Sequence, residues 1–168
     1  MTTPLVSVVA LTRDRTKEFL SLLRALRQQR MRDFEVIIVG AEPDIRDHGA
    51  TEDFADRVTY LQCVDQNISM SRNIGIGHAR GEIIAFIDDD AAPEPDWLNE
   101  LIKPFERSAI GAVGGFVRGR NGVDFQWRGA LIDRYGAHAA LTEEDLAERD
   151  FGDPNGEFFL STVGVNSA

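Results

Sequence analysis

Short runs of apolar residues alternate with polar stretches through the first third of the chain. Residues 5–11 (LVSVVAL) and 34–39 (FEVIIV) are almost unbroken apolar runs rich in β-branched side chains, a pattern typical of strands that are covered on both faces of a parallel sheet. Between them, apolar residues recur every three or four positions from Phe19 to Leu26, which predicts an amphipathic helix that ends near Arg30. Strand, helix and strand in this order predict a βαβ unit with a right-handed crossover.

The same alternation continues as far as residue 105. A polar segment with glycine and proline breakers over residues 40–57 predicts a loop, with one short helix after Thr51. The next elements are predicted as a strand over residues 58–64, a helix capped by Ser69 or Ser71 that ends before Gly81, a strand over residues 83–87, and a helix opened by Pro95 or Asp96. Together these elements predict an α/β domain with a mostly parallel sheet flanked by helices.

The pattern changes in the last third of the chain. Residues 110–117 and 123–128 flank Asn121-Gly122, a dipeptide that strongly favours a hairpin turn. Residues 158–165 (FFLSTVGV) predict one more buried strand. Because the sequence stops three residues after this strand with no closing helix, we expect the natural domain to continue past Ala168, so that this sequence is C-terminally truncated.

Length, charge and cysteine content narrow the class of protein. With 168 residues and 43% hydrophobic content, the chain is long enough for one core and short for two domains. A net charge of −10 repels nucleic acid and anionic membranes, so we expect neither as a partner. Cys63 is the only cysteine, which excludes an internal disulfide and makes a cytoplasmic location the default expectation. The sequence predicts no membrane span and no signal peptide.

Three adjacent aspartates follow the strand predicted at residues 83–87. Asp88, Asp89 and Asp90 therefore lie at the carboxyl end of a parallel strand, where ligands of open α/β sheets bind. Adjacent carboxylates repel one another unless a cation or several N–H donors compensate, and hard oxygen ligands suit Mg²⁺ or Mn²⁺ that bridges to a phosphate. We predict a divalent metal here; the alternative is that one or two of these residues cap or turn the chain before Pro93.

Three segments of the chain resemble a known family, the inverting glycosyltransferase family 2 with the GT-A fold. They are VSVVALTRDR at residues 6–15, NISMSRNIGIGHARGEIIAFIDDDAAPEPDWL at residues 67–98, and VGVNSA at residues 163–168. The middle segment is the most specific, because it combines an Arg-Asn-x-Gly helix, a glycine after an Ala-Arg pair, a buried strand and an Asp-x-Asp motif. The resemblance extends over nearly the whole chain.

The resemblance implies an organisation and a set of site residues. It implies a single GT-A, Rossmann-like domain, with a nucleotide-binding half at residues 1–108 and the start of an acceptor-side half at residues 109–168. It implies base and ribose contacts for Thr12 and Arg13 and a position near the nucleotide for Arg72. It also implies that Asp88 contacts the ribose and ligates the metal, that Asp89 contacts the nucleotide from the middle of the motif, and that Asp90 ligates the metal. The alternative for Arg72 is a solvated helix residue.

Two departures from the family pattern concern recognition and catalysis. Family members carry one or two aspartates just after the second strand, where this chain reads VGAEPD at residues 39–44, so the choice of nucleotide stays open. The family's catalytic base follows the segment that VGVNSA begins, which places it beyond residue 168. Residues 143–145 (EED) resemble that base in composition but precede VGVNSA, and we interpret them as the first turn of a solvated helix capped by Thr142.

The activity implied by the resemblance is an inverting transfer of a sugar from a nucleoside-diphosphate-sugar donor to a saccharide or other hydroxyl acceptor, assisted by Mg²⁺ or Mn²⁺. One alternative is a non-catalytic GT-A-like binding module that has lost donor recognition, which Gly40-Ala41 favours and the aspartate triplet opposes. Another is a phospho-acceptor or phosphatase domain with an aspartate nucleophile after the first strand, for which Thr12-Arg13-Asp14 is a poor match.

Overall fold

The computed structural model describes residues 3–40, 55–63, 67–106 and 110–114, together with the backbone of five short strands between residues 117 and 161. The chain divides into two compact units, Met1–Asn99 and Glu100–Ala168, and each is described by itself.

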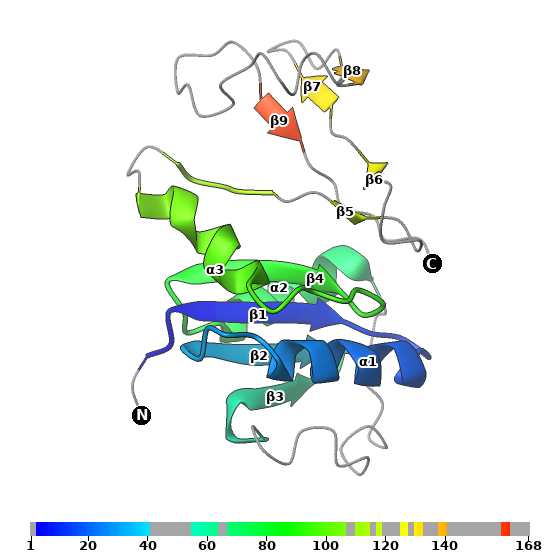
Figure 1. Ribbon diagram of the computed structural model, residues 1–168. Helices are drawn as coiled ribbons and strands as arrows, with labels where there is room; N and C mark the ends of the chain where they lie inside the picture. Colours follow the sequence, from blue (N-terminus) through cyan, green and yellow to red (C-terminus); the bar gives the residue numbers. More distant parts are fainter. Residues whose placement is uncertain are drawn as a thin grey trace. The chain divides into compact units, whose positions relative to one another are not determined.

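The first unit is built on a four-stranded parallel sheet (Figure 1). The strand order is β3-β2-β1-β4, with bounds Val6–Leu11 for β1, Phe34–Val39 for β2, Val58–Leu61 for β3 and Ile83–Asp88 for β4. Leu11 pairs with both Val39 and Asp88, so β1, β2 and β4 end level with one another. We call this end of the sheet the carboxyl edge, and the opposite end, where Val6 pairs with Phe34 and Ile83, the amino edge.

Helices connect the strands on both faces of this sheet. Their bounds are Thr16–Arg27 for α1 and Ile68–His78 for α2. Elsewhere in the chain, α3 covers Trp97–Ile102, and 3₁₀ turns cover Ala55–Arg57 and Lys103–Glu106. The β1-α1-β2 and β3-α2-β4 connections run in opposite directions across the sheet, so right-handed crossovers place α1 on one face and α2 on the other (Figure 1). Gly75 lets α2 approach the sheet closely, because a Cβ there would stand 2.4 Å from Cγ1 of Val9.

The α1 prediction is confirmed in position and differs at its end. Its apolar stripe, Phe19, Leu22, Leu23 and Leu26, is fully buried. The helix ends at Arg27, three residues before the expected Arg30, because the chain turns toward a different partner. The N–H of Arg30 donates to the carbonyl of Pro95 at 2.8 Å instead of continuing the helix.

The predictions for α2 and β3 also need correction at one end each. α2 is capped by Asn67, whose Oδ1 accepts from the N–H of Met70 at 3.1 Å, so neither Ser69 nor Ser71 is the cap. Asparagine is as good a cap as serine, and sequence spacing alone does not choose between them. β3 ends at Leu61 because its partner β2 ends at Val39, and the expected extension toward residue 64 has no strand to pair with.

The second unit contributes short antiparallel strands. β5 (Val117–Arg118) pairs with β6 (Phe125–Trp127), and β7 (Ala130–Ile132) pairs with β8 (His138–Ala140) and β9 (Phe159–Ser161). The β5–β6 pairing is the one expected around Asn121-Gly122, a dipeptide that itself lies outside the described residues.

One other prediction for the second unit is wrong in part, and two lie wholly or mostly outside the described residues. The strand expected over residues 110–117 is wrong for residues 110–114, which are not in a strand; this stretch contains glycines, which weaken strands. The helix expected from Thr142 lies outside the described residues, as does most of the strand expected over residues 158–165. Among the described helices, none has the length and apolar character needed to cross a bilayer.

Candidate functional site

The turn after β1 and the end of β4 meet at the carboxyl edge. Leu11 pairs with Asp88, so the residues that follow each of them, Thr12 and Asp89, leave the sheet side by side. The N–H of Thr12 donates to the carbonyl of Val39 at 3.2 Å, which extends the pairing one residue past β1. Asp14 then adopts a left-handed conformation with φ of 54°, which aspartate tolerates better than most residues. The turn thereby leads into α1 beside the aspartate triplet.

Asp89 is a buried carboxylate whose side chain is only 10% exposed. Burial raises the pKa of Asp89 above its ordinary 3.8, and the Asp90 carboxylate adds to the rise. The Thr12 hydroxyl, the Arg15 guanidinium and the backbone N–H of Arg13 oppose this rise without cancelling it. In the structure, Thr12 Oγ1 is buried and completes no hydrogen bond to a described residue. Negative charge on Asp89 is therefore incompletely compensated by the protein.

Asp90 is buried too, and its two oxygens differ in their partners. Its side chain is 4% exposed, and Oδ2 accepts from Nη1 of Arg15 at 3.0 Å. Oδ1 is buried and has no hydrogen-bond partner among the described residues. A buried carboxylate oxygen without a partner is energetically costly, and it is the type of ligand that Mg²⁺ and Mn²⁺ take. The donor chemistry of Asp90 thus fits a divalent cation.

The described residues offer such a cation few protein ligands. They contain no cluster of three His, Cys, Asp or Glu side chains arranged to hold a metal. Mg²⁺ in phosphate sites is commonly bound through one or two carboxylates, with the remaining positions filled by phosphate oxygens and water. The acids at the carboxyl edge therefore match a site that needs an anionic ligand for completion.

Arg15 is a residue of this site that the sequence pattern did not reveal. Its Nη1 lies 3.0 Å from Oδ2 of Asp90 and 3.5 Å from Oδ1 of Asp89, while half of its side chain is exposed. Arg15 and Asp90 are 75 residues apart in the chain, so no local spacing links them. The pairing of β1 with β4 brings this guanidinium between the two buried carboxylates, a contact that a short stretch of sequence does not predict.

Asp88 and Arg72 lie on the α2 face of the sheet. Asp88 is the last residue of β4, and its carbonyl accepts from the N–H of Ala91 at 3.1 Å in the turn that follows. Phe86, two residues earlier on the same face, carries the Arg72 guanidinium 6.0 Å from its ring centroid. The structure thus places Arg72 along the strand that ends in Asp88, with its side chain over an aromatic ring.

The side chain of Arg13, another predicted site residue, is exposed and pairs with its neighbour in the turn. That side chain is 66% exposed, and its Nε lies 3.7 Å from a carboxylate oxygen of the adjacent Asp14. Its backbone N–H, by contrast, acts on Asp89. In the described structure, Arg13 therefore contributes to the carboxyl edge through its main chain.

Gly40 explains one departure from the family pattern. This residue follows β2 at the carboxyl edge with φ of 90°, and a Cβ there would stand 2.8 Å from the carbonyl oxygen of Thr12. Both the backbone conformation and the close approach exclude a side chain at this position. An acidic residue directly after β2 is therefore incompatible with the path of the β1–α1 turn.

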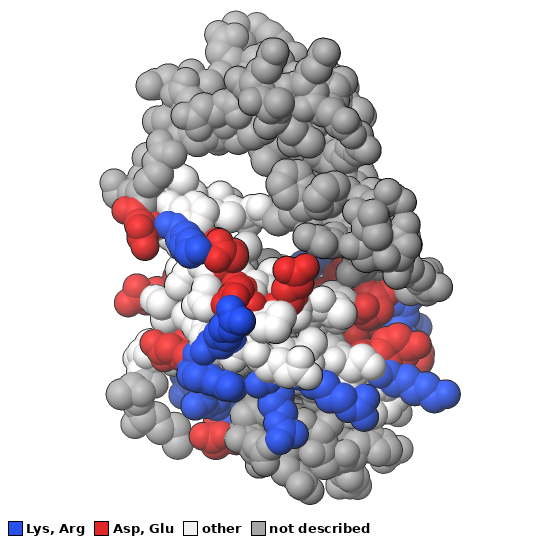
Figure 2. Space-filling view, in the orientation of Figure 1, with Lys and Arg blue, Asp and Glu red and all other residues white. Residues whose placement is uncertain are grey.

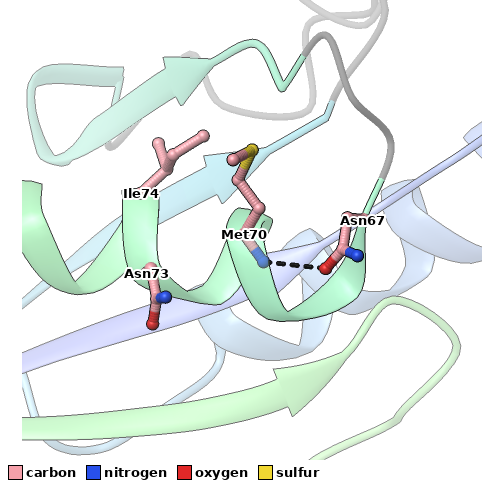
Figure 3. Close-up of a pocket in the computed structure, with 4 residues that line it drawn as sticks. All are labelled: Asn67, Met70, Asn73 and Ile74. Atoms are coloured by element: carbon pink, nitrogen blue, oxygen red, sulfur yellow. Dashed lines mark hydrogen bonds between the residues drawn. The ribbon is translucent and has the colours of Figure 1, made fainter.

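An open pocket of about 640 Å³ lies beside the first turns of α2, lined by Asn67, Met70, Asn73 and Ile74 (Figure 3). Figure 3 shows the Met70 and Ile74 side chains extending in the same direction, with Asn67 at the start of the helix bonded to the N–H of Met70. Ile74 also packs against the core formed by Val9, Ile37, Val39 and Cys63. Because α2 runs antiparallel to the strands, its first turns lie at the carboxyl edge.

The segment after the triplet is fixed to the far end of α1. Gln29 is completely buried; its Nε2 donates to the carbonyl of Glu94 at 2.7 Å, and its Oε1 accepts from the N–H of Leu98 at 3.1 Å. With the bond from Arg30 to Pro95, these contacts hold residues 94–98 against the helix. Both ends of α1 therefore contact the chain that carries the triplet.

A third buried carboxylate, that of Glu35, lies at the amino edge. Glu35 Oε1 accepts from Oγ of Ser7 at 2.7 Å and from the N–H of Arg80 at 2.8 Å, while Oε2 accepts from Nε of Arg80 at 2.8 Å. Ser7 Oγ in turn accepts from the N–H of Gly81 at 2.8 Å. We call Ser7, Glu35, Arg80 and Gly81 the Glu35 network. It joins two strands to the loop that enters β4.

Basic side chains line α1 although the whole chain carries a net charge of −10. On the face of the first unit that bears α1, Lys and Arg side chains form a row with acidic side chains beside it (Figure 2). The basic residues of α1 are Lys17, Arg24 and Arg27, all exposed. Lys17 lies in the first turn, which follows the carboxyl edge, whereas Arg24 and Arg27 lie in the last turn, at the end of the helix that leads to the amino edge.

The sequence profile described as "Glycosyl transferase family 2" matches residues 7–158. This match covers the β1–α1 turn, both edges of the parallel sheet and the aspartate triplet. The chain belongs to glycosyl transferase family 2. The family expected from the three sequence segments is thereby confirmed.

The relatives that the chain matches include a named glycosyltransferase. The chain is 35% identical over 118 residues to the glucosyl-dolichyl phosphate glucuronosyltransferase of Haloferax volcanii, covering 67% of this chain and 38% of that protein. It is 30% identical over 121 residues to the succinoglycan biosynthesis protein ExoM of Rhizobium meliloti, covering 70% and 39%. The chain thus spans well under half the length of these relatives.

Solved structures confirm the GT-A-type fold of family 2. TarS of S. aureus (residues 1–349) matches with a TM-score of 0.52 and 22% identity, over 60% of this chain and 32% of that one. The mannosyltransferase PcManGT from Pyrobaculum calidifontis, solved in complex with GDP-Man and Mn²⁺, matches with a TM-score of 0.53 and 21% identity, over 68% and 35%. At this identity the likeness establishes the fold.

Proposed function

We propose that this chain is the donor-binding part of an enzyme that transfers a sugar, with inversion, from a nucleoside-diphosphate-sugar to a hydroxyl acceptor, with the help of Mg²⁺ or Mn²⁺. The observation that carries the proposal is the buried Oδ1 of Asp90, which has no partner among the described residues and lies at the carboxyl edge of a parallel sheet. Ligands of open α/β sheets bind at this edge. Family membership supports the reaction class.

In the proposed site, Asp90 holds the metal and Asp88 supports it. A bound divalent cation would neutralise the diphosphate that leaves from the sugar. PcManGT, which shares the fold, was solved with Mn²⁺ and GDP-Man, and this supports the assignment. Asp89 differs from its neighbours because Thr12, Arg13 and Arg15 surround its carboxylate. We therefore assign Asp89 to shaping the β1–α1 turn that contacts the nucleotide.

The proposed nucleotide lies between the β1–α1 turn and the first turns of α2. The pocket of about 640 Å³ beside Asn67 and Asn73 has the size of typical small-molecule sites, and the asparagine amides offer both donors and acceptors to a base. Thr12 and the main chain of Arg13 border the ribose side of this site, and Arg72 provides a nearby positive charge. The identity of the base stays open, because Gly40 occupies the position of the family's acidic residue.

The division into a nucleotide-binding half at residues 1–108 and an acceptor-side half at residues 109–168 remains a prediction, as does a cytoplasmic location. The catalytic base is expected beyond residue 168. On this proposal, the chain binds the donor and contributes the metal site, while deprotonation of the acceptor depends on residues further along the protein.

Isothermal titration with nucleoside diphosphates of the common bases, each with and without Mn²⁺, tests the proposal. We expect one or more of them to bind in a Mn²⁺-dependent way, and Asp90→Asn to weaken that binding at least tenfold, because the amide removes the charged ligand. Asp96→Asn is the matched control, because Asp96 lies further along the same loop and its partly exposed carboxylate pairs with Arg30.

Two results would contradict the proposal. Binding of no nucleoside diphosphate at all would favour the alternative of a non-catalytic module that has lost donor recognition. Binding that does not depend on Mn²⁺, or that Asp90→Asn and Asp96→Asn affect equally, would remove the aspartate triplet from the site.

A further inference from the structure

Arg15 occupies the approach to the carboxylate proposed to hold the metal. Its Nη1 lies within hydrogen-bond distance of Oδ2 of Asp90 and 3.5 Å from Oδ1 of Asp89. The side chains of Asp90 and Asp89 are 4% and 10% exposed, so both carboxylates are largely shielded from water. Arg15 is therefore the principal positive charge next to these two acids among the described residues.

The main chain of Arg15 is fixed while its side chain has room to move. Asp14 precedes it in a left-handed conformation, and the carbonyl of Arg15 accepts from the N–H of Phe19 at 3.0 Å in the first turn of α1. Its side chain is 50% exposed, so the guanidinium can leave the carboxylates for solvent without a change in the backbone. A long flexible side chain on a fixed turn suits reversible ion pairing.

We infer that Arg15 is a resident cation that competes with the divalent metal for the Asp90 carboxylate, so that metal binding displaces its guanidinium. This inference rests on the proposed function. A metal ion would bind a carboxylate oxygen at 2.0–2.2 Å, and a guanidinium contacting the same carboxylate would repel it. With no metal bound, Arg15 keeps two adjacent buried carboxylates from repelling one another unopposed. The competition sets the metal affinity of the nucleotide-free protein.

A purely structural ion pair would behave differently. If Arg15 only held the β1–α1 turn in place, its removal would loosen the carboxylates and weaken metal binding. If Arg15 competes with the metal, its removal strengthens metal binding even though the protein without metal becomes less stable. The direction of the change in metal affinity separates the two roles.

The experiment measures Mn²⁺ binding to the 168-residue chain without nucleotide, by electron paramagnetic resonance of free Mn²⁺. Arg15→Gln should bind Mn²⁺ about three- to tenfold more tightly than the wild type, because both the competitor and its repulsion are removed. Lys17→Gln is the matched control: it removes one positive charge from an exposed residue two positions further along, and should change the affinity less than twofold. Arg15→Lys retains a competing charge and should lie between wild type and Arg15→Gln.

A second measurement follows Mg²⁺ binding in the wild-type chain and does not depend on whether Arg15→Gln folds. In ¹⁵N-labelled protein, the Arg15 side-chain signal, identified by its loss in Arg15→Lys, should shift as Mg²⁺ is added and stop shifting at saturation. An unchanged signal at saturating Mg²⁺ would overturn the inference.

The remaining outcomes are also decisive. Wild-type binding of Mn²⁺ with equal or weaker binding by Arg15→Gln would overturn the competition but leave the proposed metal site intact. Absence of Mn²⁺ binding in both proteins would overturn the proposed metal site together with the competition. Binding by Arg15→Gln alone would support both.

Discussion

The two edges of the parallel sheet each bury a carboxylate, and they treat it in opposite ways. At the amino edge, burial would by itself raise the pKa of Glu35, but hydrogen bonds from Ser7 and Arg80 outweigh it and leave the pKa below its ordinary 4.5. At the carboxyl edge, burial outweighs the nearby donors and leaves the pKa of Asp89 above its ordinary 3.8. The two pKa shifts differ because hydrogen-bond donors and positive charge compensate the Glu35 carboxylate more fully than the Asp89 carboxylate.

This contrast separates a structural acid from a functional one. Both oxygens of Glu35 are satisfied by donors on β1 and on the loop before β4, so its charge contributes to stability. Asp89 and Asp90 share a single guanidinium, and Oδ1 of Asp90 has no partner among the described residues. Carboxylates whose negative charge the protein compensates only in part are typical of functional sites, where a bound ligand completes the compensation. Replacing a carboxylate with an amide should therefore have opposite effects at the two edges.

The largest effect is expected from Glu35→Gln. The amide leaves Arg80 without its charged partner and replaces one of the two acceptor oxygens of Glu35 by a donor, which should cost about 3 kcal/mol of the free energy of unfolding, or roughly 6–12 °C in Tm. Thermal unfolding followed by circular dichroism measures it. Glu82→Gln, at an exposed acid of the same loop, should change stability by less than about 0.5 kcal/mol. Equal effects at the two positions would refute the structural role of Glu35.

The same variant makes a prediction about acid. The folded pKa of Glu35 is depressed, so its contribution to stability is present above the unfolded value of 4.5 and is lost as the pH falls through the lower folded value. Glu35→Gln should therefore lose less stability than wild type below pH 4.5. Denaturant titrations at a series of pH values test this, and parallel acid profiles would contradict it.

A slightly smaller loss of stability is expected from a substitution of a glycine at the amino edge. Gly81→Ala would place a Cβ 2.6 Å from the backbone nitrogen of Ser7, where two strands meet and nothing flexible can yield. We expect a loss of about 2 kcal/mol from overpacking. Gly77→Ala is the control within α2, because a Cβ there meets nothing within 4 Å, and it should stabilise the helix by up to about 1 kcal/mol. Destabilisation by both would point to a general intolerance of alanine.

The smallest effect has the opposite sign. Asp89 has a raised folded pKa, so its ionised form is disfavoured by folding above that pKa, and this penalty disappears below the unfolded value of 3.8. Asp89→Asn removes the penalty and should stabilise the protein at pH 7 by about 1 kcal/mol or less, with no advantage near pH 3.8. Urea unfolding at both pH values measures the difference. A loss of stability at pH 7 would break the comparison between the edges.

Much of the first unit was predictable because its order is local. The unbroken apolar runs of β1 and β2 and the 3.6-residue periodicity of the stripe from Phe19 to Leu26 are each contained in a short window of sequence, and the structure confirms these elements. The position of the aspartates at a strand end follows from one more apolar run. Helix ends were less predictable, because Asn67 and the serines near it are equivalent caps from spacing alone.

The contacts that define the two edges were not predictable, because they join residues far apart in the chain. Glu35 reads as a polar interruption of an apolar strand until Arg80 is brought beside it, 45 residues later. Arg15 reads as one charge in a polar turn until β1 pairs with β4. Strand order and register create these pairs, and neither is encoded in a short window of sequence. A glutamate in an otherwise apolar strand that is covered on both faces was nevertheless a signal that a partner was required.

Contacts at both ends of α1 have a mechanical consequence. Arg15 touches the aspartates at the beginning of the helix, and Gln29 binds Glu94 and Leu98 just past its end. Gln29 is completely buried, so its hydrogen bonds should make the end of the helix and residues 94–98 shift together when the sheet flexes. The Arg15 side chain is half exposed and can break its contact, so the segment that carries the acids would be anchored firmly beyond the triplet and reversibly at the triplet itself.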